Sequence, residues 1–110
     1  MTLDPKLPIY PIGSVARILG CSPKVLRDYE KNGLISPARS EGQQRQYSQE
    51  DIEMLTLVHG LATKTGINTA GIKLLLGLWP HLDEEGRGKL KELPKKFGVL
   101  MDPAHNETPP

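Results

Sequence analysis

The hydrophobic positions between Pro11 and Asn32 repeat with the spacing of two short helices. In the first helix the apolar residues are Ile12, Val15, Ala16, Ile18 and Leu19. They recur mostly three and four positions apart, which places them on one side of a helix. Gly20-Cys21 interrupts this pattern. Ser22-Pro23 restarts it, because serine accepts a hydrogen bond from the free amides of a new helix and proline is tolerated at the first helical position.

The second helix has an apolar side and a charged side. Val25, Leu26 and Tyr29 continue the inner face. The charged residues elsewhere on its surface are Lys24, Arg27, Asp28 and Lys31. Gly33 ends the helix, since glycine tolerates the left-handed conformation that is common after helix C-termini. Two short helices joined by a glycine-containing turn predict a helix-turn-helix, a motif that occurs with and without DNA binding.

A polar stretch, residues 38–47, follows the two helices. Its central Glu41-Gly42 is a turn signal between two short flanks, Ala38 to Ser40 and Gln43 to Tyr47. This arrangement predicts a small two-stranded hairpin, or wing. The polar residues on its arms are Arg39, Arg45 and Gln46. A solvated polar loop fits the periodicity equally well.

Two further helices follow this stretch. Ser48 with Asp51 three positions later is a capping-box pattern, which predicts a helix that ends around Thr65-Gly66. The inner face of this helix consists of Ile52, Leu55, Val58, Leu61 and Ala62. Asn68 caps the fourth helix, and Pro80 closes it. The buried stripe of the fourth helix consists of Ile72, Leu75, Leu76 and Trp79.

These elements define one structured domain, residues 10–79, with weaker segments on either side. Residues 1–9 contain two prolines and predict a flexible lead-in. Residues 80–100 predict a short, partly helical segment, and residues 101–110 a disordered tail. Within residues 83–93, DEEGRGKLKEL, the only apolar anchors are Leu90 and Leu93. The predicted fold class is mainly α, a winged helix-turn-helix with four core helices and a small two-stranded wing.

Charge separates the two halves of the chain. The 110 residues carry a net charge of +1, so the total shows no footprint of a nucleic-acid binder. Residues 1–47 hold seven Lys and Arg against four Asp and Glu, a net charge of +3, whereas residues 48–110 hold seven against nine, a net charge of −2. The helix-turn-helix lies in the basic half, which mildly favours DNA binding.

Other candidate chemistry is sparse. Cys21 is the single cysteine, which excludes an intramolecular disulfide; its apolar neighbours favour a small core residue over a redox sensor. His59, His81 and His105 lack ligand-spaced partners, so no metal site and no cofactor are expected. No stretch approaches the ~20 apolar residues of a membrane span, and the N-terminus lacks a secretory pattern. We expect a cytoplasmic, nucleoid-associated protein that is not an enzyme and does not contact a membrane.

Taken together, residues 10–79 resemble the DNA-binding domain of the MerR family. The matching signals are Ile12-Gly13, Leu26-Arg27-x-Tyr29-Glu30, Gly33-Leu34-Ile35-x-Pro37-x-Arg39, Arg45-x-Tyr47-Ser48, Asp51-Ile52 and Gly66-Ile67. Residues 66–73, GINTAGIK, are most similar to the heat-shock repressor branch, HspR, whose members repress chaperone operons. The resemblance implies a winged helix-turn-helix with its second helix in the major groove and its wing on the flanking backbone. It also implies a homodimer on an inverted-repeat operator.

The same resemblance locates the DNA contacts. The expected set is Ser22, Lys24, Arg27, Tyr29, Lys31, Arg39, Arg45, Gln46 and Tyr47. Arg27 has the chemistry to read guanine bidentately or to hold a phosphate, whereas Tyr29 and Arg45 would mainly position the DNA backbone. Asp28 departs from the family pattern, and an acid facing phosphate is unfavourable. It is therefore expected to point aside or to pair with Arg27 or Lys31.

Expected partners are double-stranded DNA, a second copy of the chain and a protein co-regulator. Most family members follow the fourth helix with a long helix that forms an antiparallel coiled coil. Residues 80–110 show no sustained heptads, so weak self-association in solution is expected. Family metal sensors also carry several cysteines after the fourth helix, and this chain has no cysteine in that region.

The predicted function is a sequence-specific transcriptional regulator, a repressor rather than an effector-gated activator. The alternative is a protein-interaction module that has kept the fold, has lost DNA binding, and antagonises or assists a larger regulator. Salt-dependent binding to duplex DNA separates the two.

Overall fold

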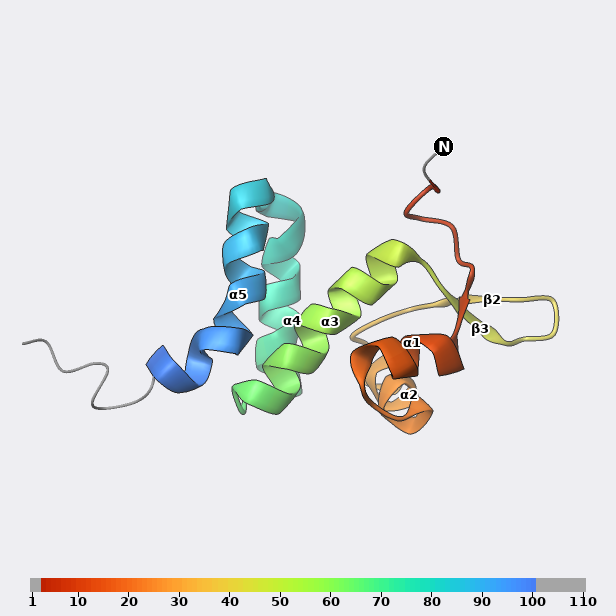
Figure 1. Ribbon diagram of the computed structural model, residues 1–110, viewed down its shortest axis with the longest axis horizontal. Helices are drawn as coiled ribbons and strands as arrows, with labels where there is room; N and C mark the ends of the chain where they lie inside the picture. Colours follow the sequence, from red (N-terminus) through yellow and green to blue (C-terminus); the bar gives the residue numbers. More distant parts are fainter. Residues whose placement is uncertain (1–2, 101–110) are drawn as a thin grey trace, which may run out of the picture. The chain divides into compact units, whose positions relative to one another are not determined.

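The computed structural model describes residues 3–100, with side chains through residue 98. The chain divides into two compact units, Met1–Val58 and His59–Pro110. Figure 1 shows the mainly helical architecture and its small sheet, as the sequence predicted. The elements in chain order are β1 (Tyr10–Pro11), α1 (Ile12–Leu19), α2 (Pro23–Lys31), β2 (Ala38–Arg39), β3 (Arg45–Tyr47), α3 (Gln49–Lys64), α4 (Thr69–Leu78), the 3₁₀ turn η1 (Trp79–His81) and α5 (Glu84–Leu100).

The predicted helix-turn-helix is present as α1 and α2. Gly20 ends α1 in the left-handed conformation at φ 71°, where a Cβ would be strained. The Ser22 hydroxyl then accepts a hydrogen bond from the Val25 amide at 3.4 Å, with Pro23 at the first helical position. After α2, Gly33 adopts φ 77° and turns the chain toward the wing. The predicted start and stop signals of both helices are therefore confirmed.

The wing is part of a sheet with one strand more than predicted. The strand order is β1-β3-β2, and all neighbours are antiparallel. The predicted hairpin is formed by β2 and β3, with Arg39 opposite Arg45. The additional strand β1 places Tyr10 opposite Tyr47. A two-residue strand is too short to show alternation in the sequence, which is why periodicity could not predict it.

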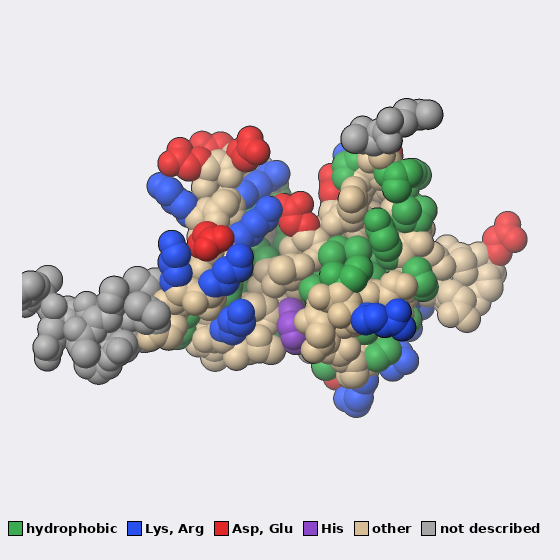
Figure 2. All heavy atoms as spheres, in the orientation of Figure 1, with side chains coloured by type: hydrophobic (Ala, Val, Ile, Leu, Met, Phe, Trp, Pro, Cys, Tyr) green, Lys and Arg blue, Asp and Glu red, His purple; other side chains and the backbone are tan. Residues whose placement is uncertain are grey.

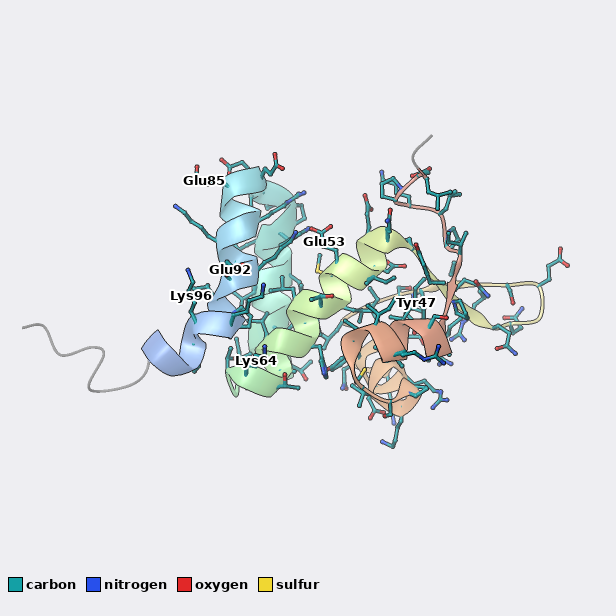
Figure 3. All side chains as sticks on the ribbon, viewed as in Figure 1. Tyr47, Glu53, Lys64, Glu85, Glu92 and Lys96 are labelled. Carbon is teal, nitrogen blue, oxygen red and sulfur yellow. The ribbon has the colours of Figure 1, made fainter. Side chains whose placement is uncertain are left out.

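The core of the N-terminal unit joins the helices to the sheet. Its fully buried cluster consists of Val15, Ala16, Leu26, Tyr47 and Leu55. These residues come from α1, α2, β3 and α3, so a single cluster fixes the second helix and the last strand of the wing to the same support. Tyr47 on β3 is labelled in Figure 3.

The start of α3 is held by two separate devices. Ser48 and Asp51 form the predicted capping box: the Asp51 amide donates to the Ser48 hydroxyl at 3.0 Å, and the Ser48 amide donates to the Asp51 carboxylate at 2.9 Å. The Glu50 amide donates to the Pro5 carbonyl at 3.0 Å. The lead-in, predicted as flexible, thus supplies an acceptor to one of the amides that a helix start leaves unpaired.

The predicted start of α4 is confirmed as well. The Asn68 side chain accepts a hydrogen bond from the Gly71 amide at 2.9 Å. Ile72 is buried, while Leu75, Leu76 and Trp79 of the predicted stripe are half-buried. On the other side of α4, Leu74 and Leu78 are 75% and 54% exposed.

The segment after α4 is more helical than predicted. It forms the 17-residue helix α5, which continues through Pro94. Leu90 and Pro94 are its buried residues, and Pro94 packs on Gly60 of α3: a Cβ on this glycine would lie 3.1 Å from the proline Cβ. Arg87 also lies over the Trp79 ring, 5.1 Å from its centroid, and donates to the Trp79 carbonyl at 3.1 Å. These contacts stabilise α5, although its glycines and its proline give it a low intrinsic helix propensity.

Two remaining predictions concern the ends of the chain and membranes. The predicted tail, residues 101–110, lies outside the described residues. Across residues 3–100, no helix is long and apolar enough to cross a membrane.

Candidate nucleic-acid interface

The outer side of α2 presents a row of charged side chains to solvent. Lys24, Arg27 and Lys31 are exposed and lie three and four positions apart, so they share one helix face. Leu26 is fully buried on the other side of the helix. Ser22, which caps the helix, is exposed at its N-terminal end. The core thus holds α2 with its basic side outward, which is the orientation that a recognition helix needs.

Asp28 pairs differently from the prediction. Its carboxylate forms an ion pair with Lys24 at 3.0 Å, one helical turn earlier, and not with Arg27 or Lys31. The prediction of those two partners was wrong because an i,i+4 pair along α2 brings lysine and aspartate together without distorting the helix. Both side chains are at least half exposed, so the pair stabilises the fold by no more than about 1 kcal/mol.

The two wing arginines converge on one carboxylate of α2. Glu30 accepts a hydrogen bond from Arg45 Nε at 2.5 Å and from Arg39 Nη2 at 3.0 Å. Arg39 also donates to the Gln43 carbonyl at 3.4 Å, within the hairpin. The glutamate and Arg45 side chains are only 23% and 24% exposed. We call these three residues, Glu30, Arg39 and Arg45, the wing clamp, since they connect both strands of the hairpin to α2.

The two tyrosines of the expected DNA-contact set both pack against the core of the N-terminal unit. The sequence placed Tyr47 among the contacts, but its side chain is fully buried beneath the wing, and its hydroxyl is buried with no hydrogen-bond partner among the described residues. Burial raises the pKa of Tyr47. The guanidinium groups of Arg45 and Arg39 lower this pKa, whereas the carboxylates of Glu30 and Asp51 raise it. Tyr29 packs against the same core, and burial raises its pKa as well.

The other candidate groups lie off this face. Cys21 packs against the core cluster, and burial raises the pKa of its thiol, which agrees with a small core residue. Within residues 3–100, no group of three or more potential metal ligands comes together. Gln46 is half-buried on the central strand β3. The exposed polar groups at this face therefore come mainly from α2 and from the wing arginines.

The local sequence did not predict a role for Glu30. Its partners Arg39 and Arg45 lie 9 and 15 positions later, beyond the reach of helix or hairpin spacing rules. The only signal was its place in the Leu26-Arg27-x-Tyr29-Glu30 motif, together with the two arginines of the wing motifs.

Comparison with known proteins identifies the family of this chain. The profile of the MerR HTH family regulatory proteins matches residues 10–78, which include α2 and the whole sheet. The chain belongs to the MerR family. This membership confirms the family resemblance and the winged helix-turn-helix fold.

The sequence relatives are regulators of this family. The chain is 45% identical over 71 residues to the heat shock protein HspR of Streptomyces coelicolor, covering 64% of this chain and 47% of that protein. It is 38% identical over 69 residues to the transcriptional regulator GlnR of Bacillus anthracis, covering 63% of this chain and 53% of that protein. The chain thus spans about half the length of the curated relatives it matches.

Solved structures share the fold. HiNmlR, a MerR family regulator lacking the sensor domain and bound to promoter DNA, superposes with a TM-score of 0.63 at 29% identity, over 79% of this chain and 67% of that one. PbrR691 from Ralstonia metallidurans CH34, in complex with lead(II), gives a TM-score of 0.59 at 27% identity, over 93% and 90% of the two chains.

Proposed function

We propose that this MerR-family chain is a sequence-specific DNA-binding transcriptional regulator that reads an operator with α2 and its wing. The observation that carries the proposal is a set of basic side chains on the outer side of α2 and on the wing, connected through Glu30. Its basic residues are Lys24, Arg27, Lys31, Arg39 and Arg45. The promoter-DNA complex of HiNmlR supports it, since that protein shares the fold.

The chemistry of these side chains suits some of them to base reading and others to contacts with the DNA backbone. An α-helix such as α2 fits the major groove, where an exposed arginine like Arg27 donates two parallel hydrogen bonds to guanine. Lys24 and Lys31 are point charges suited to phosphates, and Arg39 from the wing serves the flanking backbone. Base reading by one arginine and positioning by several cations give both specificity and salt-dependent affinity.

A repressor of the heat-shock type is the form of regulation that the comparisons favour. HspR of Streptomyces coelicolor is 45% identical over the matched region. Such a regulator works in the cytoplasm at the nucleoid and binds an inverted repeat, because an operator dyad mirrors a two-fold axis of the protein. The protein co-regulator expected from the sequence belongs to the same proposal.

The C-terminal unit offers a surface for the second copy. The outward side of α5 forms a shallow hollow lined by Glu85, Gly88, Lys89, Glu92, Leu93 and Lys96. Figure 2 shows basic side chains gathered over this helix and acidic ones at its N-terminal end, and Figure 3 labels Glu85, Glu92 and Lys96 in order along it. We call these six residues the α5 stripe.

The α5 stripe is complementary to itself. Antiparallel pairing about the midpoint between Leu90 and Lys91 places each Glu85 opposite the Lys96 of the other copy, and each Lys89 opposite the other Glu92. The same symmetry places Leu93, which is 45% exposed, opposite Gly88, where no side chain stands in the way. Every charged residue of the stripe thereby meets an opposite charge, and the one large apolar residue meets the smallest.

This pairing predicts weak association in solution. Exposed ion pairs contribute about 0–1 kcal/mol each, and the intrahelical pair of Lys89 with Glu85 at 3.4 Å must be exchanged or shared. The exposed Leu74 and Leu78 of α4 add apolar area to the same unit. The dimer therefore forms chiefly when two half-sites hold two copies together, which raises their effective concentration.

Selection of duplexes from a random pool by the full chain tests the proposal. A regulator enriches an inverted repeat, and its affinity for the enriched duplex falls steeply with salt. Recovery of no consensus, together with no salt-dependent binding to any duplex, would overturn the proposal in favour of an interaction module that has kept the fold.

A further inference from the structure

Both oxygens of the Glu30 carboxylate accept hydrogen bonds within the wing clamp. Its Oε1 accepts from Arg45 Nε at 2.5 Å and from Arg39 Nη2 at 3.4 Å, and its Oε2 accepts from the same Arg39 nitrogen at 3.0 Å. Glu30 lies in the last turn of α2, whereas the arginines belong to β2 and β3. One side chain of the recognition helix therefore holds both strands of the wing.

The register of the hairpin places two like charges beside this carboxylate. Arg39 and Arg45 are direct cross-strand partners, and like charges at such a pair repel each other. The carboxylate of Glu30 between them offsets this repulsion. Because the glutamate is only 23% exposed, solvent and salt screen these interactions less than they screen the exposed pair of Lys24 with Asp28.

The clamp has two opposite effects on DNA binding. It fixes the positions of both arginines relative to α2. The wing can then contact the DNA backbone while α2 is in the position to read bases. It also lowers the local charge, since two arginines and one glutamate carry +1 instead of +2. A lower positive charge weakens non-specific binding, which depends on counterion release, while a fixed geometry favours the duplex that fits.

We infer that Glu30 is a positioning residue that sets DNA specificity through Arg39 and Arg45 without contacting the DNA. This inference rests on the proposed function. Loss of the glutamate charge frees the wing arginines and adds one positive charge. Binding to unrelated duplexes then strengthens, and the preference for the selected duplex falls.

Glu30→Gln tests this, with Glu41→Gln as the matched control. Glutamine has the same size as glutamate and lacks its charge. Glu41 is exposed in the turn of the same hairpin, so its variant gives the wing the same charge change with the clamp intact. Each protein is titrated, as the full chain, with the duplex enriched by selection and with a shuffled duplex of equal composition over a salt series.

Both variants are expected to bind the shuffled duplex more tightly than the parent. Only Glu30→Gln is expected to lower the ratio of selected to shuffled affinity, by about tenfold or more, which corresponds to the cost of one mismatched base pair. Glu30→Asp keeps the charge and shortens the reach, so its ratio falls while its salt slope on the shuffled duplex stays that of the parent.

Three outcomes would overturn the inference. The first is an equal ratio for Glu30→Gln and Glu41→Gln; the second is an unchanged ratio for Glu30→Asp. In the third, Glu30→Gln loses affinity for both duplexes alike in proportion to a lowered melting temperature, which assigns the residue a purely structural role. A parent chain that does not distinguish the two duplexes overturns the proposed function itself, which is a separate result.

Discussion

Glu30 of α2 accepts a hydrogen bond from Arg45 Nε of β3 at 2.5 Å, across 15 positions of the chain. Together with the shared core under Leu26 and Tyr47, this contact makes the second helix and the wing one structural unit. A substitution in the wing therefore acts on the helix as well, and the effects of arginine substitutions depend on which of them take part in the clamp.

Arg27→Ala is expected to weaken binding to the selected duplex by about 1–3 kcal/mol and to relax selection at a single base position, because we assign base reading to this exposed arginine of α2. Competition titrations with single-base variants of the selected duplex measure this. Lys64→Ala, an exposed substitution at the end of α3, is the charge-matched control. Unchanged affinity of Arg27→Ala for every duplex would show that this face does not read DNA.

Arg45→Ala is expected to weaken binding to every duplex, since we assign Arg45 to the DNA backbone. It is also expected to lower the preference for the selected duplex without a loss confined to one base position, since it removes one arm of the wing clamp. The same substitution removes one arm of the clamp and lowers the free energy of unfolding by about 1 kcal/mol, in the range of partly exposed ion pairs. Binding at two salt concentrations and denaturant melts of the same sample separate the two effects. A loss of affinity confined to one base position of the duplex would contradict the assignment of Arg45 to the backbone.

Leu26→Ala and Ile72→Ala are each expected to lower the free energy of unfolding by about 2–5 kcal/mol, because both side chains are buried and leave a cavity. They probe the N-terminal and the C-terminal unit separately. Ile18→Ala is the control, since Ile18 is 58% exposed and its loss is expected to change the stability by less than about 0.5 kcal/mol. Melts of either core variant that match the parent would show the helical faces to be misassigned.

Glu85→Lys is expected to abolish the weak self-association of the free chain, because it places lysine opposite Lys96 of the second copy. The double variant Glu85→Lys/Lys96→Glu is expected to restore it with the charges exchanged. Sedimentation over a concentration series, with and without a two-half-site duplex, measures both. A tight dimer at nanomolar concentration, or no rescue in the double variant, speaks against pairing by the α5 stripe. Strict one-to-one binding to that duplex with protein in excess speaks against any dimer.

Tyr47→Phe is expected to leave the stability at neutral pH unchanged or raised, because the buried hydroxyl it removes has no hydrogen-bond partner among the described residues. Burial raises the pKa of Tyr47, so the folded state holds this proton more tightly than the unfolded state. The parent should therefore lose stability as the pH rises above the unfolded value of about 10, and the variant should lose less.

Denaturant melts from pH 7 to pH 11 compare the two proteins. Part of the alkaline loss is expected to remain in Tyr47→Phe, because burial raises the pKa of Tyr29 too. A large loss of stability in the variant at pH 7 would show that the hydroxyl has a partner.

The features that could be predicted from the sequence are those in which cause and effect lie within a few residues. The caps at Ser22, Ser48 and Asn68 each bond an amide three positions later, so the spacing alone indicates them. The left-handed glycine after each short helix is equally local.

The features that were missed depend on residues far apart in the chain. Strand β1 depends on the pairing of Tyr10 with Tyr47, which lies 37 positions later. Helix α5 continues through Pro94, which packs on Gly60 of α3. Tyr47 showed the polar pattern of a wing residue, yet the pleat turns its side chain into the core. Such assignments need the tertiary arrangement, which no local pattern contains.

The contact of Gly60 with Pro94 pairs the two residue types that helices tolerate least. Replacing a helical glycine by alanine gains about 1 kcal/mol where the surface is open. Here the added methyl group would lie 3.1 Å from the proline Cβ and 3.4 Å from its Cγ. The neighbouring proline would have to move by a few tenths of an ångström to admit this methyl group. The usual gain from replacing a helical glycine therefore depends at position 60 on the residue at position 94, and the two positions are best varied together.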